Sequence, residues 1–599
     1  MKTEYVMGNA AIALGALAAG AGLAAGYPGT PSSEIIETIA KFNDGNVHVE
    51  WSVNEKAALE VAAAASYSGA RTLVTMKQVG LNVASDPLMS LAYVGVEGGM
   101  VIVSADDPGP ISSQTEQDTR RFASFARIPV FDPASPEEAY QMIQDAFACS
   151  EKYHTPVLFR PTTRVCHAYA SIEIPESFSV KTPAGFVKNS NRWVIFPRLS
   201  FANHTMIEKR NPEIGEEYSS YRFNTVEGDL SASKAILTGG ISYAYVKEIL
   251  RNRKDVKLIR VATPYPIPER FLLQALEGVQ EVLCIEELSP VLEEAAVSLT
   301  GLHHLPLTVL GKRSGHIPHA GENSADSLRP VIAAFTGAAD CPDSPDLSDM
   351  PALPVRPPVL CAGCPHRASF YAVKAAMKGK KANFCGDIGC YTLGNAMPLD
   401  MVDTCLCMGA GVTMAQGLHW INPDAVNFAF IGDSTFFASG MTGVVNALYN
   451  QARMVLVVLD NSTTAMTGHQ PHPGTGKTMM GDIVAKIDLV KILEGMGVQK
   501  IRVTDPLDLS KAVETVKDCA ATEGVSAIIF KSPCVAITKP DGLMEIGEDC
   551  IQCHRCIREI GCPGLVIREG KVAVDAGLCT GCGLCAQLCP KNAIHLAKR

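Results

Sequence analysis

Eight cysteines lie in the last fifty residues of this 599-residue chain and constrain its fold more than any other feature. They form two runs, Cys550-x2-Cys553-x2-Cys556-x5-Cys562-Pro563 and Cys579-x2-Cys582-x2-Cys585-x3-Cys589-Pro590. A zinc site or a disulfide knot would explain paired cysteines alone, but zinc needs only four ligands and usually separates its pairs by a longer loop. Three thiolates at this spacing can hold one face of an iron–sulfur cubane, so the runs predict two [4Fe-4S] clusters and one-electron transfer.

The spacing resembles that of two-cluster bacterial ferredoxins, in which the fourth cysteine of each run binds the other cluster. This resemblance assigns one set of ligands to cluster 1 and another to cluster 2: Cys550, Cys553, Cys556 and Cys589, and Cys562, Cys579, Cys582 and Cys585. The first run departs from the usual spacing, because five residues instead of three separate its last two cysteines. We therefore expect a longer loop and a more labile cluster there.

Length and charge narrow the class of protein. A chain of 63.8 kDa is too long for one core and suggests about four domains. The net charge of -10, with no run rich in Lys or Arg, argues against nucleic acid as a partner. Twenty cysteines without a convincing export signal indicate thiols and thiolate ligands in a reducing compartment, which predicts the cytoplasm.

An apolar, Ala- and Gly-rich stretch from Gly8 to Gly26 superficially resembles a signal sequence. Its interleaved glycines and the single lysine ahead of it favour a close-packed helix on a sheet, so no membrane association is expected. The Gly20-x-Gly22-x3-Gly26 pattern within it is a weak match to a dinucleotide-binding loop. Because it is misplaced before any strand, we predict that these glycines serve helix packing.

Short β-branched runs alternate with helical patterns along most of the chain, which predicts parallel sheets covered on both faces. The first group has strands at 47–51, 72–76, 100–104 and 157–160 and helices at 54–66 and 136–152, and the second has strands at 235–237, 256–261 and 281–285. A polar stretch from Glu176 to Asn224 is expected to be a linker or an arm over a neighbour. Six prolines between Cys341 and Pro358 indicate a boundary.

The predicted fold class is therefore α/β, with three parallel-sheet domains and a small C-terminal α+β module that holds the two clusters. The predicted domains are 1–180, 225–340, 359–540 and 541–599.

Polar residues follow two strands of the third group. Asn427–Ile431 ends in Gly432-Asp433-Ser434, and Met454–Leu459 ends in Asp460-Asn461. Carboxyl ends of neighbouring parallel strands are where open α/β sheets bind ligands, and the oxygens of Asp433 and Asn461 suit Mg²⁺. Gly432 is small enough for a diphosphate to approach the backbone. Plain Asx turns at the two strand ends are the alternative.

The pattern resembles the thiamine diphosphate motif, with Ser434 and Asp460 in place of the more common Gly and Asn. Thiamine also needs a carboxylic acid beside its aminopyrimidine. Glu55, at the start of an apolar helix, is the candidate, because burial would raise its pKa and keep it protonated. A solvent-facing acid at a helix N-terminus is the alternative for this residue.

With the ferredoxin-like tail, several further segments resemble the 2-oxoacid:ferredoxin oxidoreductases over nearly the whole chain, above all the members that act on arylpyruvates. They are Tyr27-Pro28-Gly29-Thr30-Pro31-Ser32-Ser33-Glu34, Cys361-Ala362-Gly363-Cys364-Pro365-His366-Arg367, Gly386-Asp387-Ile388-Gly389-Cys390, the stretch from Thr464 to Pro473, and Gly311-Lys312 with Gly321-Glu322. The resemblance implies pyrimidine-binding, transketolase C-terminal-like, diphosphate-binding and ferredoxin domains, in this order.

It also implies roles for single residues. Thr30 would contact the 2-oxoacid, Glu55 the aminopyrimidine, and Asp433 and Asn461 Mg²⁺, with a backbone carbonyl near Thr463 as a further ligand. His469 and His472 would border thiamine or substrate, with loop-rim histidines as the alternative. A third cluster would use Cys361, Cys364, Cys390 and Cys534, but members that act on arylpyruvates are usually credited with two clusters. Four buried thiols remain the alternative.

The activity implied by the resemblance is oxidative decarboxylation of an arylpyruvate, with coenzyme A taking the acyl group and ferredoxin the electrons. A small separate beta subunit in an α2β2 complex is implied as well. Two rivals are a non-oxidative thiamine decarboxylase, which would have no use for eight cluster ligands, and an electron-transfer adapter with a degenerate thiamine scaffold. Glu55, Asp433 and Asn461 together speak against the second rival. A nucleotide P-loop at His472–Thr478 fails, because Pro471 stands where its first glycine is required.

Overall fold

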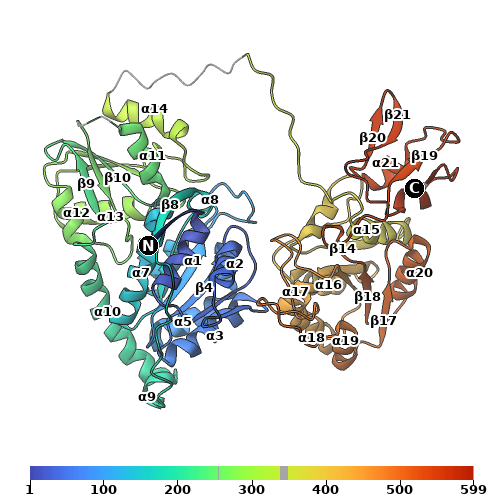
Figure 1. The fold of residues 1–599 in the computed structure, drawn as a ribbon, viewed down its shortest axis with the longest axis horizontal. Helices are drawn as coiled ribbons and strands as arrows, with labels where there is room; N and C mark the ends of the chain where they lie inside the picture. Colours follow the sequence, from blue (N-terminus) through green and yellow to red (C-terminus); the bar gives the residue numbers. More distant parts are fainter. Residues whose placement is uncertain (252, 254, 338–348, 598–599) are drawn as a thin grey trace. The chain divides into compact units, whose positions relative to one another are not determined.

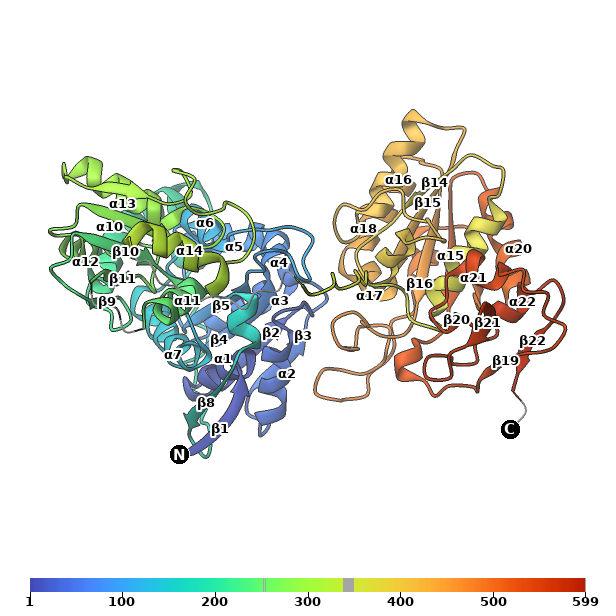
Figure 2. The ribbon, with the colours of Figure 1, turned by 90° about the horizontal axis from the view of Figure 1, so that it is seen from above.

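The computed structural model describes residues 1–251, 253, 255–337 and 349–597 (Figures 1 and 2). The chain divides into two compact units, Met1–Pro351 and Ala352–Arg599. The division falls within the proline-rich segment that predicted a boundary, part of which, with Pro342 and Pro345, lies outside the described residues. The finer division into four domains stays a prediction. Among the described helices, none has the length and the apolar character needed to cross a membrane.

The first unit contains a six-stranded parallel sheet with the order β3-β2-β4-β5-β7-β6. Its strands are β2 (Leu23–Gly26), β3 (His48–Trp51), β4 (Thr72–Lys77), β5 (Met100–Ala105), β6 (Val130–Phe131) and β7 (Val157–Phe159). The four strands predicted here are confirmed to within about one residue at each end. Their continuous apolar runs suit a sheet that is buried on both faces.

Helices cover both faces of this sheet. They are α1 (Gly8–Ala18), α2 (Ser33–Phe42), α3 (Glu55–Tyr67), α4 (Gln78–Val83), α5 (Ser85–Val94), α6 (Thr119–Ala126), α7 (Pro136–Tyr153) and α8 (Thr163–His167). Figure 2 shows α1, α2 and α7 on one face and α3 and α5 on the other. The two predicted helices, now α3 and α7, are confirmed.

The apolar N-terminal stretch forms the buried helix α1, as predicted, and Gly15 packs against the backbone of Tyr140 on α7. The predicted role of the next three glycines was wrong. Gly20 lies in a turn with φ +77°, Gly22 precedes β2, and Gly26 ends β2, where a Cβ would meet Thr75. A strand also precedes the stretch, because β1 (Lys2–Met7) pairs antiparallel with β8 (Tyr169–Ile174).

The expected linker between Glu176 and Asn224 was only partly right. It contains a short helix, α9 (Ser190–Trp193), and the 22-residue helix α10 (Pro197–Tyr218). The buried side of α10 is formed by residues at helical spacing: Ile207, Arg210, Asn211, Ile214, Gly215 and Tyr218. The segment therefore packs on its own unit over the second half of this helix.

The second sheet of this unit has the order β13-β12-β10-β11-β9 and is parallel except for β9. Its strands are β9 (Thr225–Gly228), β10 (Lys234–Thr238), β11 (Lys257–Arg260), β12 (Glu281–Ile285) and β13 (Thr308–Leu310). The helices are α11 (Gly240–Leu250), α12 (Glu269–Ala275), α13 (Val291–Leu302) and α14 (Ala325–Thr336). One core joins the sheet to α12 and α13, and another joins it to α11 and α14.

The second unit has a five-stranded parallel sheet of order β14-β15-β16-β18-β17. Its elements are α15 (Pro365–Ala376), β14 (Ala382–Cys385), α16 (Ala410–Ile421), β15 (Val426–Gly432), α17 (Asp433–Thr435), α18 (Met441–Tyr449), β16 (Met454–Asp460), α19 (Leu489–Met496), β17 (Lys500–Thr504), α20 (Leu509–Ala520) and β18 (Val525–Lys531). On β15, Phe428 and Phe430 face α15 and α20, whereas Ala429 and Ile431 face α16 and α18. This alternation is the two-residue period of a strand.

A small module follows, with antiparallel pairs β19–β22 and β20–β21. Its elements are β19 (Met544–Ile546), α21 (Arg555–Ile560), β20 (Leu565–Arg568), β21 (Lys571–Val574), α22 (Leu584–Gln587) and β22 (Ile594–Leu596). Ile560 and Leu584 belong to the same apolar core as Phe370 of α15. The module thus shares a core with the α15 face of the sheet, and the predicted fold class is confirmed.

Candidate functional site

In the first unit, Glu55 is the first residue of α3 and is only 8% exposed. The Asn54 side chain caps the helix by accepting a hydrogen bond from the Ala57 N–H. Burial raises the pKa of the Glu55 carboxyl to about 7, against smaller opposing effects of the helix backbone and Lys77. The sequence predicted this burial and this direction, and the solvent-facing alternative for Glu55 is wrong.

The absence of a side chain at Gly80 leaves room for the Glu55 carboxyl. A Cβ on Gly80 would lie 2.6 Å from Glu55 Oε1, so any larger residue at position 80 would displace this carboxyl. Lys77, at the end of β4, runs past Gly29 and donates a hydrogen bond from Nζ to the Ser112 carbonyl. Ser112 in turn donates from Oγ to the Thr30 carbonyl. Thr30 and Glu55 therefore belong to one polar region at the carboxyl ends of β2 and β4.

In the second unit, Asp433 and Asn461 directly follow the neighbouring parallel strands β15 and β16. Asp433 Oδ2 accepts a hydrogen bond of 2.9 Å from the Ser462 N–H, next to Asn461. Oδ1 accepts another of 2.9 Å from the Ser434 N–H. The two strand ends are thus joined at Asp433, as a shared ligand site at this edge requires.

A second carboxylate lies beside the first. Burial raises the pKa of Asp460, and the neighbouring carboxylate of Asp433 raises it further. His472 Nε2 lies 3.2 Å from Asp433 Oδ2, and both side chains are nearly buried. Two carboxylates in contact repel each other unless a proton or a cation lies between them.

His366, at the start of α15, also reaches this edge, although no role was predicted for it from the sequence. The Asn461 side-chain amide lies 3.2 Å from His366 Nε2, and burial lowers the pKa of the imidazole to about 4. The neutral ring accepts from the Asn461 Nδ2–H, while Asn461 Oδ1 accepts from the Thr463 N–H at 3.2 Å. His366 therefore orients the amide. No signal in the sequence linked two residues so far apart in the chain.

Tyr391 and Asp387 complete the surroundings of the first strand end. A Cβ on Gly432 would lie 2.6 Å from the Tyr391 ring, so the ring approaches the glycine closely. The Tyr391 hydroxyl donates to Asp387 Oδ2 at 3.0 Å and lies 3.2 Å from Thr435 Oγ1. Burial raises the pKa of Asp387 to about 6. The sequence placed Asp387 in a motif but assigned it no function.

The other predicted residues of this edge differ in position. Ser434 and Thr463 are buried beside Asp433 and Asn461. His469 is exposed in a loop with φ +66°, and its N–H donates to the Thr464 carbonyl. Of the two predicted histidines, only His472 reaches Asp433.

The donor set fits a magnesium ion. Asp433 would supply a carboxylate oxygen and Asn461 Oδ1, which keeps a free lone pair after its bond to Thr463, an amide oxygen, with the carboxylate of Asp460 beside them. Mg²⁺ prefers such hard oxygen ligands and would relieve the repulsion between the two acids. The sequence predicted Asp433 and Asn461 as ligands but not the contact with Asp460.

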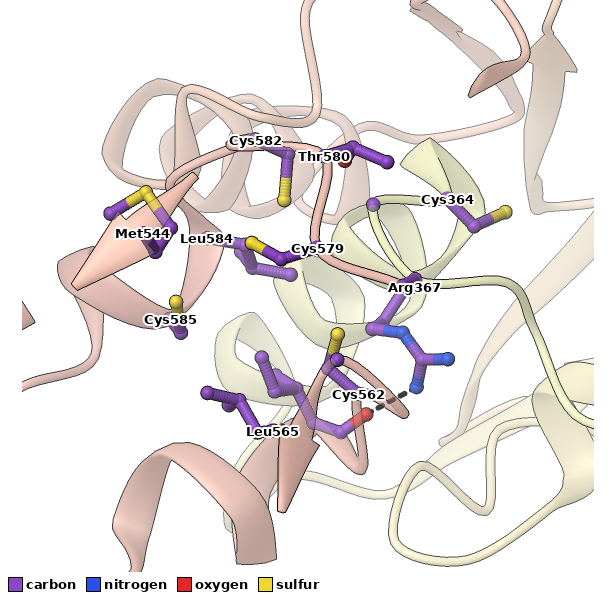
Figure 3. A pocket seen from close by; sticks show the side chains of 14 residues that line it. Cys364, Arg367, Met544, Cys562, Leu565, Cys579, Thr580, Cys582, Leu584 and Cys585 are labelled. Carbon is purple, nitrogen blue, oxygen red and sulfur yellow. Dashed lines mark hydrogen bonds between the residues drawn. The ribbon is translucent and has the colours of Figure 1, made fainter. Parts of the chain in front are cut away.

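Four cysteines of the C-terminal module line one cavity. Cys562, Cys579, Cys582 and Cys585 come from both runs, and their sulfurs face a common space in Figure 3. Apolar groups of Met544, Leu565 and Leu584 close the same cavity. The set is the one expected for cluster 2, including the residue contributed by the other run.

A second cavity is lined by Cys550, Cys553, Cys556 and Cys589, the set expected for cluster 1. In the part of the chain that the structure describes, no three His, Cys, Asp or Glu side chains converge closely enough to hold a single metal ion. The cysteines surround a space rather than a point, which is the arrangement that a cubane needs.

The remaining predicted cysteines also approach one another. Cys364 interacts electrostatically with Cys361 and Cys390, and Cys390 interacts with Cys534. Burial raises the pKa of Cys364 to about 12 and of Cys390 to about 11. Cys361 is exposed, so the alternative of four buried thiols does not describe this set. The Cys534 N–H donates to the Asn461 carbonyl at 3.0 Å, which places the set next to the diphosphate edge.

Three family models match the chain. They are described as "Pyruvate flavodoxin/ferredoxin oxidoreductase, thiamine diP-bdg" over residues 14–227, "Thiamine pyrophosphate enzyme, C-terminal TPP binding domain" over 387–530, and "4Fe-4S binding domain" over 572–595. The fold, the site and these matches define a thiamine diphosphate-dependent 2-oxoacid:ferredoxin oxidoreductase that carries an iron–sulfur cluster.

Comparison with individual proteins identifies the family within this class. The indolepyruvate oxidoreductase subunit IorA of Methanothermobacter thermautotrophicus is 39% identical over 98% of this chain and 97% of its own length. The subunit of the same name from Thermococcus kodakarensis is also 39% identical, over 99% of this chain and 97% of its own. The chain belongs to the family of indolepyruvate oxidoreductase subunits IorA.

One solved structure is a weak likeness. A 2-oxoglutarate:ferredoxin oxidoreductase from Magnetococcus marinus, with 2-oxoglutarate, coenzyme A and succinyl-CoA bound, is 18% identical, covers 56% of this chain and 65% of its own, and has a TM-score of 0.43.

Proposed function

We propose that this chain catalyses the oxidative decarboxylation of arylpyruvates, such as indolepyruvate, to aryl-acetyl-CoA while it reduces ferredoxin. The main supporting observation is that one polypeptide combines a buried Glu55 of raised pKa, an acid–amide edge at Asp433 and Asn461, and two cavities that are each lined by four cysteines of the C-terminal module. The name of its relatives, indolepyruvate oxidoreductase, supports the substrate class.

The proposed cofactors are thiamine diphosphate, Mg²⁺ and two [4Fe-4S] clusters, with a third cluster at Cys361, Cys364, Cys390 and Cys534. When bound, thiamine diphosphate supplies the nucleophilic carbon for decarboxylation. Glu55 would hold a proton for the aminopyrimidine ring, because its raised pKa keeps a large fraction of it protonated near neutral pH. Asp433 and Asn461 would hold Mg²⁺, with Asp460 beside them and His366 fixing the amide.

Thr30 would contact the 2-oxoacid from the polar region that it shares with Glu55. His472 would stabilise the Asp433 carboxylate, and the exposed His469 would border the substrate. The partners proposed are ferredoxin, coenzyme A and a small beta subunit in an α2β2 complex. The designation of the relatives as a subunit supports the beta partner. We place the enzyme in the cytoplasm.

Anaerobic purification tests the proposal directly. We expect the protein to contain thiamine, seen as thiochrome fluorescence after denaturation, and iron with an equal amount of acid-labile sulfide. Across a panel of 2-oxoacids, ferredoxin reduction dependent on coenzyme A should be fastest with indolepyruvate, phenylpyruvate or hydroxyphenylpyruvate. Clusters without thiamine would instead identify an electron-transfer adapter, and CO2 release without ferredoxin reduction would identify a non-oxidative decarboxylase.

A further inference from the structure

The helix α15 joins the diphosphate edge to the C-terminal module through two consecutive residues. His366 contacts Asn461, as described above, and Arg367 lines the cavity of Cys562, Cys579, Cys582 and Cys585. Figure 3 shows the Arg367 side chain reaching from its helix toward Cys562. The proposed function gives no role to this arginine.

Arg367 is only 4% exposed, although a buried guanidinium is costly without partners. Its two terminal nitrogens donate to backbone carbonyls on both sides of the cavity wall: Ile560 and Gly561 of the module, and Leu360 and Cys361 ahead of α15. Within the described residues, its Nε has no hydrogen-bond partner. Carbonyls satisfy hydrogen bonds but leave the positive charge uncompensated.

Cysteine side chains can supply the opposite charge once they are deprotonated, as cluster ligands are. Burial lowers the pKa of Arg367, and Cys562, Cys364, Cys582 and Cys361 oppose this shift as negative groups, with Cys562 the strongest among them. Two of these cysteines belong to the set of cluster 2, and the other two belong to the set of the third cluster. One buried cation is therefore influenced by cysteines of both sets of potential cluster ligands.

The packing of the loop before α15 keeps this arrangement tight. Gly363 has φ +73°, and a Cβ there would lie only 1.9 Å from Thr580 Oγ1, between Cys579 and Gly581. Ala362, Gly363 and Cys364 line the same cavity as the module cysteines. The guanidinium is thus held against this cavity by both of its walls.

We propose that Arg367 is the positioning residue that raises the reduction potential of the cluster held by Cys562, Cys579, Cys582 and Cys585, and so makes it an electron acceptor within the chain. This rests on the proposed function, which assigns a [4Fe-4S] cluster to these cysteines. Oxidation of one 2-oxoacid releases two electrons, and a cluster held by these cysteines would pass them to ferredoxin one at a time, gaining one negative charge with each. A buried positive charge stabilises the more negative state, and burial weakens screening by water.

The test uses the complete, anaerobically purified enzyme and follows each cluster by EPR and visible absorption during potentiometric titration. R367M removes the charge at similar length, R367Q removes it but keeps a donor, and R367K keeps it. In R367M and R367Q we expect one cluster to become at least tenfold harder to reduce, which is about 59 mV for one electron. R367K should stay within half of that shift.

K374Q is the matched control, because Lys374 lies on the same helix and also donates to backbone carbonyls, those of Pro398 and Leu399, but does not line the cavity. Its potentials should equal those of the wild type. Unchanged potentials in R367M and R367Q, or an equal shift in R367K, overturn the proposal. If both neutral variants lose this cluster while R367K keeps it, the positive charge of residue 367 acts on the cluster and the proposal is supported. Loss of the cluster in R367K as well would indicate a purely structural arginine and overturn the proposal.

The two proposals fail differently. A wild-type enzyme without cubane iron and sulfide would refute the proposed cofactors. A wild-type enzyme with normal clusters, whose potentials do not respond to Arg367, would refute only the role of the arginine.

Discussion

The carboxyl of Glu55 makes stability depend on pH. Its pKa is raised by burial from 4.5 to about 7, so the folded protein favours the neutral form. Below pH 4.5 the acid is neutral in both states and burial costs nothing through this group. As the pH rises to about 7 the unfolded state ionises first, and stability falls by about 3 kcal/mol in total.

The first prediction follows from this fall in stability as the pH rises. E55Q should abolish the pH-dependent loss, so that at pH 8 the variant without ligand unfolds at higher denaturant concentration than the wild type, while near pH 4.5 the two coincide. Denaturant unfolding, followed by a probe in the first unit, checks it at both pH values. An equal difference at the two pH values would show that the carboxyl of Glu55 titrates normally.

Asp433 and Asp460 are adjacent acids with different expected roles. D433N removes the carboxylate that joins both strand ends, so we expect loss of most bound Mg²⁺ and thiamine. D460N is the matched control, because it introduces the Asn that is common in the thiamine motif and relieves the repulsion between the acids. It should retain thiamine. Thiochrome content after gel filtration measures both variants, and equal loss in the two would assign the metal to the pair rather than to Asp433.

Among the elements, α10 shows why part of the fold could not be predicted from the sequence. Its buried face has helical spacing, but Arg210 and Asn211 interrupt the apolar pattern, and Pro212 lies inside the helix. The burial of the two polar residues is possible because both donate to the Arg127 carbonyl. Such a partner is visible only in the folded chain, whereas β4 and α3 carry their own apolar periodicity and were predicted.

The loop before α15 gives a prediction about how the module docks. G363A forces a Cβ into Thr580 at a residue with positive φ, whereas G379A, just beyond the same helix, has φ +77° with nothing within 4 Å. G379A should cost about 1–2 kcal/mol for the backbone alone. G363A should cost about 1–3 kcal/mol more and lose iron from the cavity that Thr580 lines. Denaturant unfolding and iron content of the two variants measure the difference. Equal losses of stability and iron in both variants would show that Thr580 can move aside without an energetic cost.

For the whole molecule, the sequence predicted which residues carry chemistry better than how they interact. The crossed cysteine sets were expected from the resemblance of their spacing to that of two-cluster ferredoxins, and each set lines its own cavity. The contacts of His366 with Asn461 and of Arg367 with the module were not, because they join segments separated by more than ninety residues. The spacing of cysteines in the sequence identifies cluster ligands that are close together in the chain. The distant segments are brought together only by the packing of α15.

Glu55 and Asp433 lie in different units of the chain, and the proposed function gives each of them a role toward thiamine diphosphate. E55Q should lower 2-oxoacid-dependent ferredoxin reduction by at least about 100-fold, the lower bound for a positioned acid or base, with iron content unchanged. D433N should lower it as much by preventing cofactor binding. The double variant E55Q/D433N should then be no slower than the slower single variant, because residues that act as a unit are not additive.

Comparing the single variants with the double variant distinguishes two residues that act together from two residues that act independently. If Glu55 and Asp433 contributed independently to the transition state of one rate-limiting step, the losses would multiply, and the double variant would be roughly 100-fold slower than either single variant. Reduction of the clusters by dithionite, followed by electron transfer to ferredoxin, bypasses thiamine and should be the same in all three variants and the wild type. A loss in that assay would mean that the substitutions disturb the path of the electrons and not the chemistry at the 2-oxoacid.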